Sequence, residues 1–264
     1  MGDRIVWLAR GLVQVPATHA WLSPREAERL AAMRYGKRSS EFLVSRFAAK
    51  LALARAVGLE VADVADLARI EVARRPTGAP TALLSGEPAG VAMSSTDRAD
   101  WAVTVVGTAA GSPGVDGLEV GCDLELVEPR SPGFVRDYLT TSEQALVEEA
   151  AWPVEVTANL LWSAKESALK VLQTGLRRDT RSVEVVLEEG GPLDGWHPLR
   201  VHPVEGGTFP GWWRRAGSFL LTVAANRPTP PPLSLERPDA LAGASPSHRW
   251  LEDPLRRGRS PRST

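Results

Sequence analysis

The chain has 264 residues, a hydrophobic content of 43% and a formal net charge of −1. This composition is typical of a globular protein with a sizeable core, and it excludes disorder along the whole chain. Residues 1–100 carry 14 Lys and Arg against 11 Asp and Glu, a net +3, whereas residues 101–227 carry 11 against 17, a net −6. The uneven charge suits an anionic ligand held with a divalent cation, and the small basic excess argues against nucleic acid as a partner.

No apolar run in the sequence approaches the roughly 18 residues of a membrane span. An acid and an arginine also interrupt residues 1–15, where a signal peptide would be apolar. We therefore expect a cytoplasmic protein with no membrane partner. Cys122 is the only cysteine, so the chain has neither an internal disulfide nor a cysteine-based zinc cluster.

Residues 23–58 are expected to form two helices that break near Tyr35 and Gly36. Ser23 followed by Pro24 is typical of a helix start, and Gly58 is typical of a helix end. In the second helix an apolar set recurs at helical spacing and should face the core: Phe42, Leu43, Phe47, Leu51 and Ala54. The basic residues of this helix should face solvent or a ligand: Lys37, Arg38, Arg46 and Lys50.

Strand patterns follow, and the same order of elements then recurs. The sequence predicts a loop at residues 74–80 and two strands at 89–95 and 100–107. In the second half it predicts two helices, at 140–151 and 154–175, and then three strands, at 182–189, 199–205 and 217–228. This order favours an α+β fold of two similar α/β subdomains, residues 1–115 and 116–227, which pack as a pseudo-dimer.

The last part of the chain, residues 228–264, is rich in proline, serine and arginine. Because this composition supplies little apolar surface to bury, we expect a disordered tail whose removal is tolerated.

Two acids share one face of a predicted strand at residues 118–126. Alternation places Leu118, Val120, Cys122, Leu124 and Leu126 on one face, and Asp123 and Glu125 on the other. A half-buried strand with a solvated polar face explains this pattern. A Mg²⁺ site explains it too, since two adjacent carboxylates repel each other and Gly121 leaves room for a close approach.

The helix at residues 154–175 places Trp162, Glu166 and Lys170 on one stripe, one turn apart. A surface ion pair between Glu166 and Lys170 is the simplest interpretation. Together with the strand, however, three carboxylates and a lysine fit a metal site for a phosphoryl or pyrophosphoryl group. Lysine would then act as a mobile positive charge on a phosphate oxygen.

Residues 120–128, VGCDLELVE, and 162–170, WSAKESALK, resemble the paired signature of the 4′-phosphopantetheinyl transferases of the surfactin-synthetase-activating type. Members of this family read G-(I/V)-D-(I/L)-E and W-x-x-K-E-(A/S)-x-x-K. Residues 74–80, RRPTGAP, are similar to the family's G-(K/R)-P loop, and residues 91–95, VAMSS, are similar to its S-(L/I)-S-H strand. With the helices of residues 23–46, the resemblance covers most of the chain up to about residue 227.

The resemblance implies transfer of the 4′-phosphopantetheine arm from coenzyme A to a serine of an apo acyl or peptidyl carrier protein. It implies Mg²⁺ bound by Asp123, Glu125 and Glu166 and bridging to the coenzyme A pyrophosphate. Glu166 would accept the serine proton, directly or through water. Lys170 would neutralise the departing 3′,5′-adenosine bisphosphate. The two-unit plan and the length favour a monomer, as in the broad-specificity branch of the family.

The same resemblance assigns coenzyme A contacts to the first half: Arg34, Arg74, Gly78, Ala79, Pro80, Ser94 and Ser95. Arg34 and Arg74 are expected to receive the 3′-phosphate. Two positions depart from the family pattern, because Ser95 stands where histidine is usual and Ala79 where lysine or arginine is frequent. Each change removes a contact worth on the order of 1–3 kcal/mol if it is desolvated, so we expect weaker coenzyme A binding with the chemistry intact.

Two other functions remain as alternatives. The first is a non-catalytic paralogue that binds carrier protein or coenzyme A, and Ser95 and Ala79 support it. The retained acids and Lys170 favour the transferase, because paired carboxylates repel each other without a metal. The second is a Mg²⁺-dependent phosphohydrolase, which needs a water-positioning group that the motifs do not supply.

Overall fold

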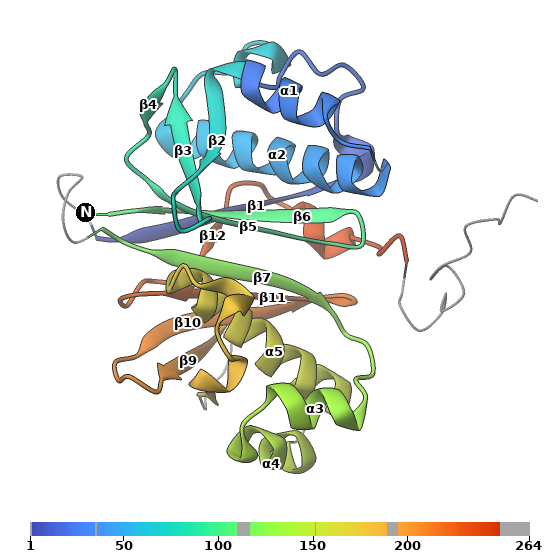
Figure 1. The fold of residues 1–264 in the computed structure, drawn as a ribbon, viewed down its shortest axis with the longest axis vertical. Helices are drawn as coiled ribbons and strands as arrows, with labels where there is room; N and C mark the ends of the chain where they lie inside the picture. Colours follow the sequence, from blue (N-terminus) through green and yellow to red (C-terminus); the bar gives the residue numbers. More distant parts are fainter. Residues whose placement is uncertain (1, 35, 110–116, 151, 189–194, 249–264) are drawn as a thin grey trace, which may run out of the picture.

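The computed structural model describes residues 2–34, 36–109, 117–150, 152–188 and 195–248. Two sheets pack face to face, and each carries a long helix on its outer side, so that the molecule has four layers (Figure 1). The helices are α1 (Pro24–Ala31), α2 (Gly36–Val57), α3 (Pro132–Tyr138), α4 (Thr141–Glu149) and α5 (Val154–Val171). The strands are β1 (Arg4–Gly11), β2 (Ile70–Arg74), β3 (Pro80–Leu84), β4 (Glu87–Pro88), β5 (Ala92–Arg98), β6 (Trp101–Thr108), β7 (Val120–Leu126), β8 (Val183–Leu187), β9 (His197–Pro203), β10 (Phe209–Ala216), β11 (Phe219–Ala225) and β12 (Leu233–Ser234).

Both halves of the chain build the same arrangement. The first sheet has the order β12-β1-β6-β5 and packs against α2, and a small sheet of β2, β3 and β4 lies beside it. The second sheet has the order β7-β11-β10-β9-β8 and packs against α5. The predicted α+β class and the two similar units are thereby confirmed. The expected boundary between residues 115 and 116 lies outside the described residues.

The apolar faces of the two sheets form one shared core. Trp7 of β1, Val105 of β6, Leu124 of β7 and Leu221 of β11 are all at most 2% exposed within it. This inner core explains why β1, β6 and β11 are almost continuously apolar, since each is covered on its other face by a helix. Hydrophobic burial therefore holds the two halves together.

Each half also contains a fully buried lysine that pairs with a helix-capping glutamate. In the first half, Glu26 caps α1 with Ser23 and accepts a hydrogen bond from Val72 N at 3.1 Å. Lys50 of α2 lies 2.6 Å from Glu26 and donates to the carbonyl of Trp21. Lys50 is 0% exposed, so the expectation that it faces solvent or ligand is wrong, because the buried carboxylate supplies its counter-charge.

The second half repeats this device on α4 and α5. Glu143 caps α4 with Thr140, and it accepts a hydrogen bond from Val185 N at 2.8 Å. Lys165 of α5 is 0% exposed and lies 2.7 Å from Glu143. The matching partners in both halves show that the two units share one structural plan although their sequences show no visible repeat.

The expected disordered tail is wrong for residues 228–248, which pack on the first half. β12 pairs in parallel with β1, and Leu241 is 0% exposed in the core between the sheets. Glu236 accepts hydrogen bonds from Arg10 and from Arg55, which lies 2.6 Å away. The hydrogen bond from Arg10 lowers the pKa of Glu236 most, and the hydrogen bond from Arg55 lowers it further. Together they outweigh burial, which raises the pKa, so that it lies at about 2. The part of the tail at residues 249–264 lies outside the described residues.

A chain that ends at Pro228 is expected to be less stable than one that ends at His248, which keeps all these contacts. Truncation removes Glu236, the ion-pair partner of Arg10, together with the pairing of β12 on β1. It also removes Leu241, which is 0% exposed, and loss of a buried leucine side chain alone costs about 2–5 kcal/mol. Urea denaturation of the two chains measures the difference, and equal midpoints would contradict the packing described above.

Candidate active site

β7 presents two acids toward α5, as its alternation predicts. Leu118, Cys122 and Leu124 lie in the core between the sheets, so Asp123 and Glu125 point to the opposite face. Both acids are buried, with 6% and 8% of their surfaces exposed. Helix α5 therefore covers the strand face on which the carboxylates lie.

Gly121 allows α5 to lie this close to the strand. A Cβ atom at this position would stand 1.9 Å from the carbonyl oxygen of Ser167, which belongs to the helix backbone. The helix backbone cannot yield as a flexible side chain can. Glycine at this position therefore sets the distance between the acids of β7 and the polar stripe of α5.

Gly121→Ala is expected to destabilise the protein by about 3 kcal/mol, at the upper end of overpacking costs. The matched control is Gly117→Ala, because an added Cβ there has no atom within 4 Å, and it should change stability by less than about 0.5 kcal/mol. Thermal or urea unfolding of both variants tests this. Equal stability of the two would show that α5 can shift away from β7 at little cost.

Asp123 lies at the centre of the polar contacts. Its carboxylate accepts hydrogen bonds from Lys170 Nζ at 2.9 Å, Ser163 Oγ at 3.0 Å and Thr96 Oγ1 at 3.2 Å. Lys170 also donates to the carbonyl of Cys122 at 2.8 Å. Burial opposes the positive charge of Lys170, but the charge and hydrogen bond of Asp123 outweigh it and raise the pKa of Lys170 above its ordinary value.

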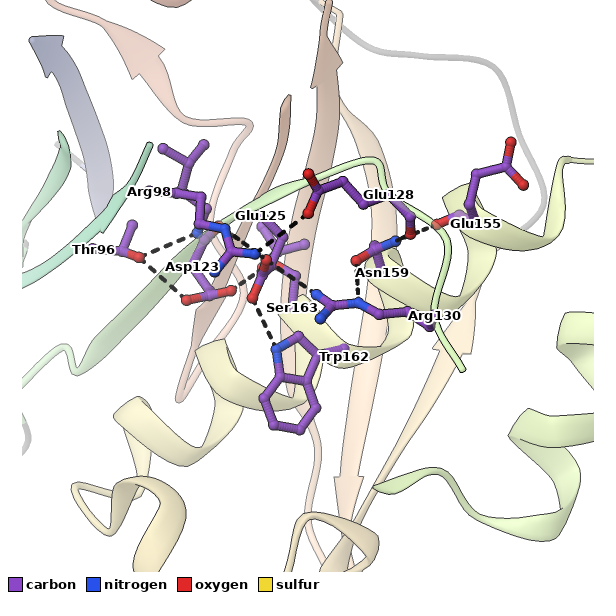
Figure 2. A network of polar contacts seen from close by, with 12 residues as sticks. Thr96, Arg98, Asp123, Glu125, Glu128, Arg130, Glu155, Asn159, Trp162 and Ser163 are labelled. Atoms are coloured by element: carbon purple, nitrogen blue, oxygen red, sulfur yellow. Dashed lines mark hydrogen bonds and ion pairs between the residues drawn. The ribbon is translucent and has the colours of Figure 1, made fainter. Parts of the chain in front are cut away.

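Glu125 is held by two hydrogen-bond donors and by a further ion pair. Trp162 Nε1 donates to Glu125 Oε1 at 3.0 Å, and Arg130 Nη2 donates to Glu125 Oε2 at 3.1 Å (Figure 2). Arg98 reaches the same Oε2 from β5 at 3.4 Å. Burial raises the pKa of Glu125 and the charge of Asp123 raises it further, while the two arginines oppose both effects.

Glu166 lies one helical turn before Lys170 and is half-buried. Burial and then the charge of Asp123 raise its pKa to about 7, Lys170 opposes this rise, and Glu125 adds to it. A carboxyl group with this pKa can gain or lose a proton near neutral pH.

The three acids fit a hard divalent cation by chemistry, although they do not form a ready-made cage. Among the described residues, no group of three or more His, Cys, Asp or Glu side chains is arranged to hold a metal. Instead Lys170, Arg98 and Arg130 neutralise the acids. The expected metal set of Asp123, Glu125 and Glu166 therefore stays a prediction. Its donors are all carboxylates, which suit Mg²⁺.

A pocket of about 390 Å³ is lined by residues of both halves, and none of the three acids is among them. It brings together most of the residues predicted to bind coenzyme A: Arg74, Gly78, Ala79, Pro80, Ser94 and Ser95. Lys170 lines the same pocket. Arg34 is exposed and is not among the lining residues, so the structure does not place it with the others.

The two serines of β5 also have structural partners. Ser94 Oγ accepts a hydrogen bond from Cys122 N at 3.1 Å, and Ser95 Oγ lies 2.8 Å from Thr104 Oγ1. Ser94 and Thr96 thus tie β5 to β7 at the edges where the two sheets meet, since Thr96 Oγ1 accepts from Leu124 N at 3.3 Å. Arg75 pairs with Glu119, and Arg98 pairs with Glu125.

Two arginines that the sequence analysis did not assign to the site form a basic patch with Arg74. Arg29 and Arg46 each lie over the Phe42 ring, 5.5 and 4.9 Å from its centre. Burial lowers the pKa of Arg46 to about 10; Glu26 opposes this, and the nearby charges of Arg29 and Arg74 add to it. Arg46 is buried, and its Nε lies 3.5 Å from Glu26 Oε1, so of the two expected surroundings, solvent or a ligand, solvent is wrong. Phe42 and Arg46 are four residues apart and so share one face of α2. This spacing is the signal in the sequence that could have indicated the patch.

A comparison with protein-family models matches residues 119–196 to the family described as the 4′-phosphopantetheinyl transferase superfamily. The matched segment contains β7 and α5, and hence Asp123, Glu125, Glu166 and Lys170. A comparison with curated proteins gave no match. Within the described ranges, no helix combines the length and apolar character that a membrane span requires. The match covers less than a third of the chain and does not distinguish subtypes, but it supports the 4′-phosphopantetheinyl transferase superfamily for the segment that carries the site.

Proposed function

We propose that this chain transfers the 4′-phosphopantetheine arm of coenzyme A to a serine of an apo acyl or peptidyl carrier protein. One observation carries the proposal: Lys170 lines the pocket and its Nζ also contacts Asp123 at 2.9 Å. The acids and the pocket are therefore parts of one site. A ligand with a phosphate near Lys170 would place that phosphate beside the carboxylates.

The pocket would take the nucleotide end of coenzyme A. Its volume is within the usual range of small-molecule pockets. The basic patch of Arg29, Arg46 and Arg74 would attract the 3′-phosphate, in place of the expected pair of Arg34 and Arg74.

The reaction would be a displacement at the phosphorus that bears the pantetheine arm. The serine oxygen attacks this phosphorus, and the bond to the bridging pyrophosphate oxygen breaks, releasing 3′,5′-adenosine bisphosphate. Glu166 accepts the serine proton, directly or through a water. Lys170 stabilises the negative charge that develops on the leaving bisphosphate.

Asp123, Glu125 and Glu166 would hold Mg²⁺, for which Glu125 must give up part of its contact with Arg98 or Arg130. When bound, Mg²⁺ supplies positive charge that stabilises the transferring phosphoryl oxygens. We also propose that the protein is a cytoplasmic monomer of the surfactin-synthetase-activating type.

The test is incubation with coenzyme A, Mg²⁺ and a panel of apo carrier proteins, followed by mass spectrometry of the carriers. The expected result is addition of one phosphopantetheine arm to a carrier serine, with release of 3′,5′-adenosine bisphosphate. Carrier or coenzyme A binding without transfer would favour the non-catalytic paralogue.

A further inference from the structure

Contacts between the two halves of the chain join residues that line the pocket. Thr77, in the hairpin loop between β2 and β3, donates from Oγ1 to Gln173 Oε1 at 2.9 Å. Arg177 Nη2 donates to the carbonyl oxygen of Thr77 at 2.8 Å. We call Thr77, Gln173 and Arg177 the hairpin clasp; all three line the pocket.

The backbone after α5 is shaped to bring Arg177 back over the pocket. The helix ends at Val171, and Gln173 and Gly175 have φ values of 56° and 52°. A left-handed glutamine is uncommon and costs on the order of 1 kcal/mol, so surrounding contacts must favour it. Arg177 Nε also donates to Thr174 O at 3.2 Å, which fixes the direction of its side chain.

The charge of the lining fits a ligand with more than one phosphate. Arg74, Lys170 and Arg177 come from β2, α5 and the turn after α5, and all three line the pocket. The acid of this lining is Glu119, which lies 2.8 Å from Arg75 and is thereby neutralised. Arg177 and Ala79 line the same pocket. Because the Ala79 side chain is uncharged, position 79 adds no positive charge to the hairpin loop.

We propose that Arg177 is a phosphate-binding and specificity-determining residue, which carries positive charge from the second half of the chain to the hairpin of the first. This inference rests on the proposed function, because it makes Arg177 a contact for a phosphate of the coenzyme A nucleotide. The hydrogen bonds to Thr77 and Thr174 pre-orient the guanidinium, which lowers the entropy cost of binding. The clasp thus makes ligand binding dependent on both halves.

Calorimetric titration of the full chain with coenzyme A, dephospho-coenzyme A and inorganic pyrophosphate tests the assignment. Arg177→Gln keeps hydrogen-bond donors and loses the charge, so Kd for coenzyme A should rise about fivefold to tenfold. Arg177→Lys should keep most of the affinity. A rise confined to coenzyme A assigns Arg177 to the 3′-phosphate, and an equal rise for dephospho-coenzyme A assigns it to the pyrophosphate.

Two further variants separate charge from structure. Gln173→Ala removes the other clasp contact and keeps the charge, so its effect should be smaller than that of Arg177→Gln and independent of salt. Adding Ala79→Lys to Arg177→Gln should restore affinity, since position 79 lines the same pocket.

Unchanged Kd in Arg177→Gln, or an equal loss in Gln173→Ala, would overturn the inference. If the wild type binds pyrophosphate in an Arg177-dependent manner but does not bind coenzyme A, the proposed function fails, and Arg177 remains a phosphate-binding residue for another ligand; binding of none of the three ligands would overturn both.

Discussion

Glu166→Gln is expected to lower kcat for phosphopantetheine transfer by about 10²–10⁴-fold, the range typical of loss of a general base. Glutamine keeps the shape of the side chain and cannot accept the serine proton. Mass spectrometry of an apo carrier protein at timed intervals measures the rate. The matched control is Glu148→Gln, an exposed position on α4, which should transfer at the wild-type rate.

The same variant should be more stable than the wild type at alkaline pH in the presence of a chelator. Burial raises the folded-state pKa of Glu166 from 4.5 to about 7. Between these values the folded protein binds more protons than the unfolded chain, so the stability of the wild type falls as pH rises through this window. Glutamine does not titrate and escapes this loss.

Unfolding experiments at pH 5 and pH 8 should therefore show little difference at pH 5 and a gain for Glu166→Gln on the order of 1–3 kcal/mol at pH 8. Glu148→Gln should match the wild type at both values. A variant that loses transfer and also loses stability at pH 8 would show that Glu166 serves the fold and not proton transfer.

The position of the acids could be predicted from sequence because their pattern is local. Alternation along β7 places Asp123 and Glu125 on one face, and helical spacing places Glu166 and Lys170 on one stripe of α5. Each conclusion needs only the geometry of a single element. That these elements face each other at close range depends on Gly121, whose meaning becomes clear only when Ser167 O lies against it.

The buried ion pairs could not be predicted, because a charged residue on a helix normally indicates a solvated face. Lys50 and Lys165 are buried because Glu26 and Glu143 are already inside the fold as capping residues. The two members of each pair are distant along the chain. Sequence pattern alone therefore assigned Lys50 to the surface.

The packed tail was missed for a similar reason. A proline-rich composition indicates that a segment has little apolar surface to bury by itself. It does not indicate whether the segment can pair with the edge of an existing sheet. β12 contributes two residues beside β1, and Leu241 fills a site between the sheets. β1 and β10 were also absent from the predicted elements, although the structure places both within sheets.

The contacts that Arg98 and Arg130 make with an acid of the expected metal site could not be predicted from the sequence. Both contact Glu125 Oε2, and Arg98 comes from the first half of the chain. Of the three acids, Asp123 is the one that contacts Lys170 directly, and its charge raises the pKa of both Glu125 and Glu166. Removal of its charge should therefore affect metal binding, the lysine and the pocket together.

Asp123→Asn is expected to lower transfer by at least about 10³-fold and to weaken Mg²⁺ binding more than tenfold. The amide keeps the size of the side chain but brings no negative charge for a cation or for Lys170. Because Lys170 then lacks its counter-charge, stability should also fall, by about 1–3 kcal/mol. Calorimetric titration with Mg²⁺, unfolding in chelator and the transfer assay measure the three effects separately.

Asp179→Asn is the control, since Asp179 forms an exposed pair with Arg181 at 3.2 Å. This variant should change neither transfer, nor Mg²⁺ binding, nor stability. Full wild-type activity in excess chelator, or wild-type Mg²⁺ affinity in Asp123→Asn, would contradict a metal held by these acids, whereas loss of stability alone would reduce Asp123 to a structural partner of Lys170.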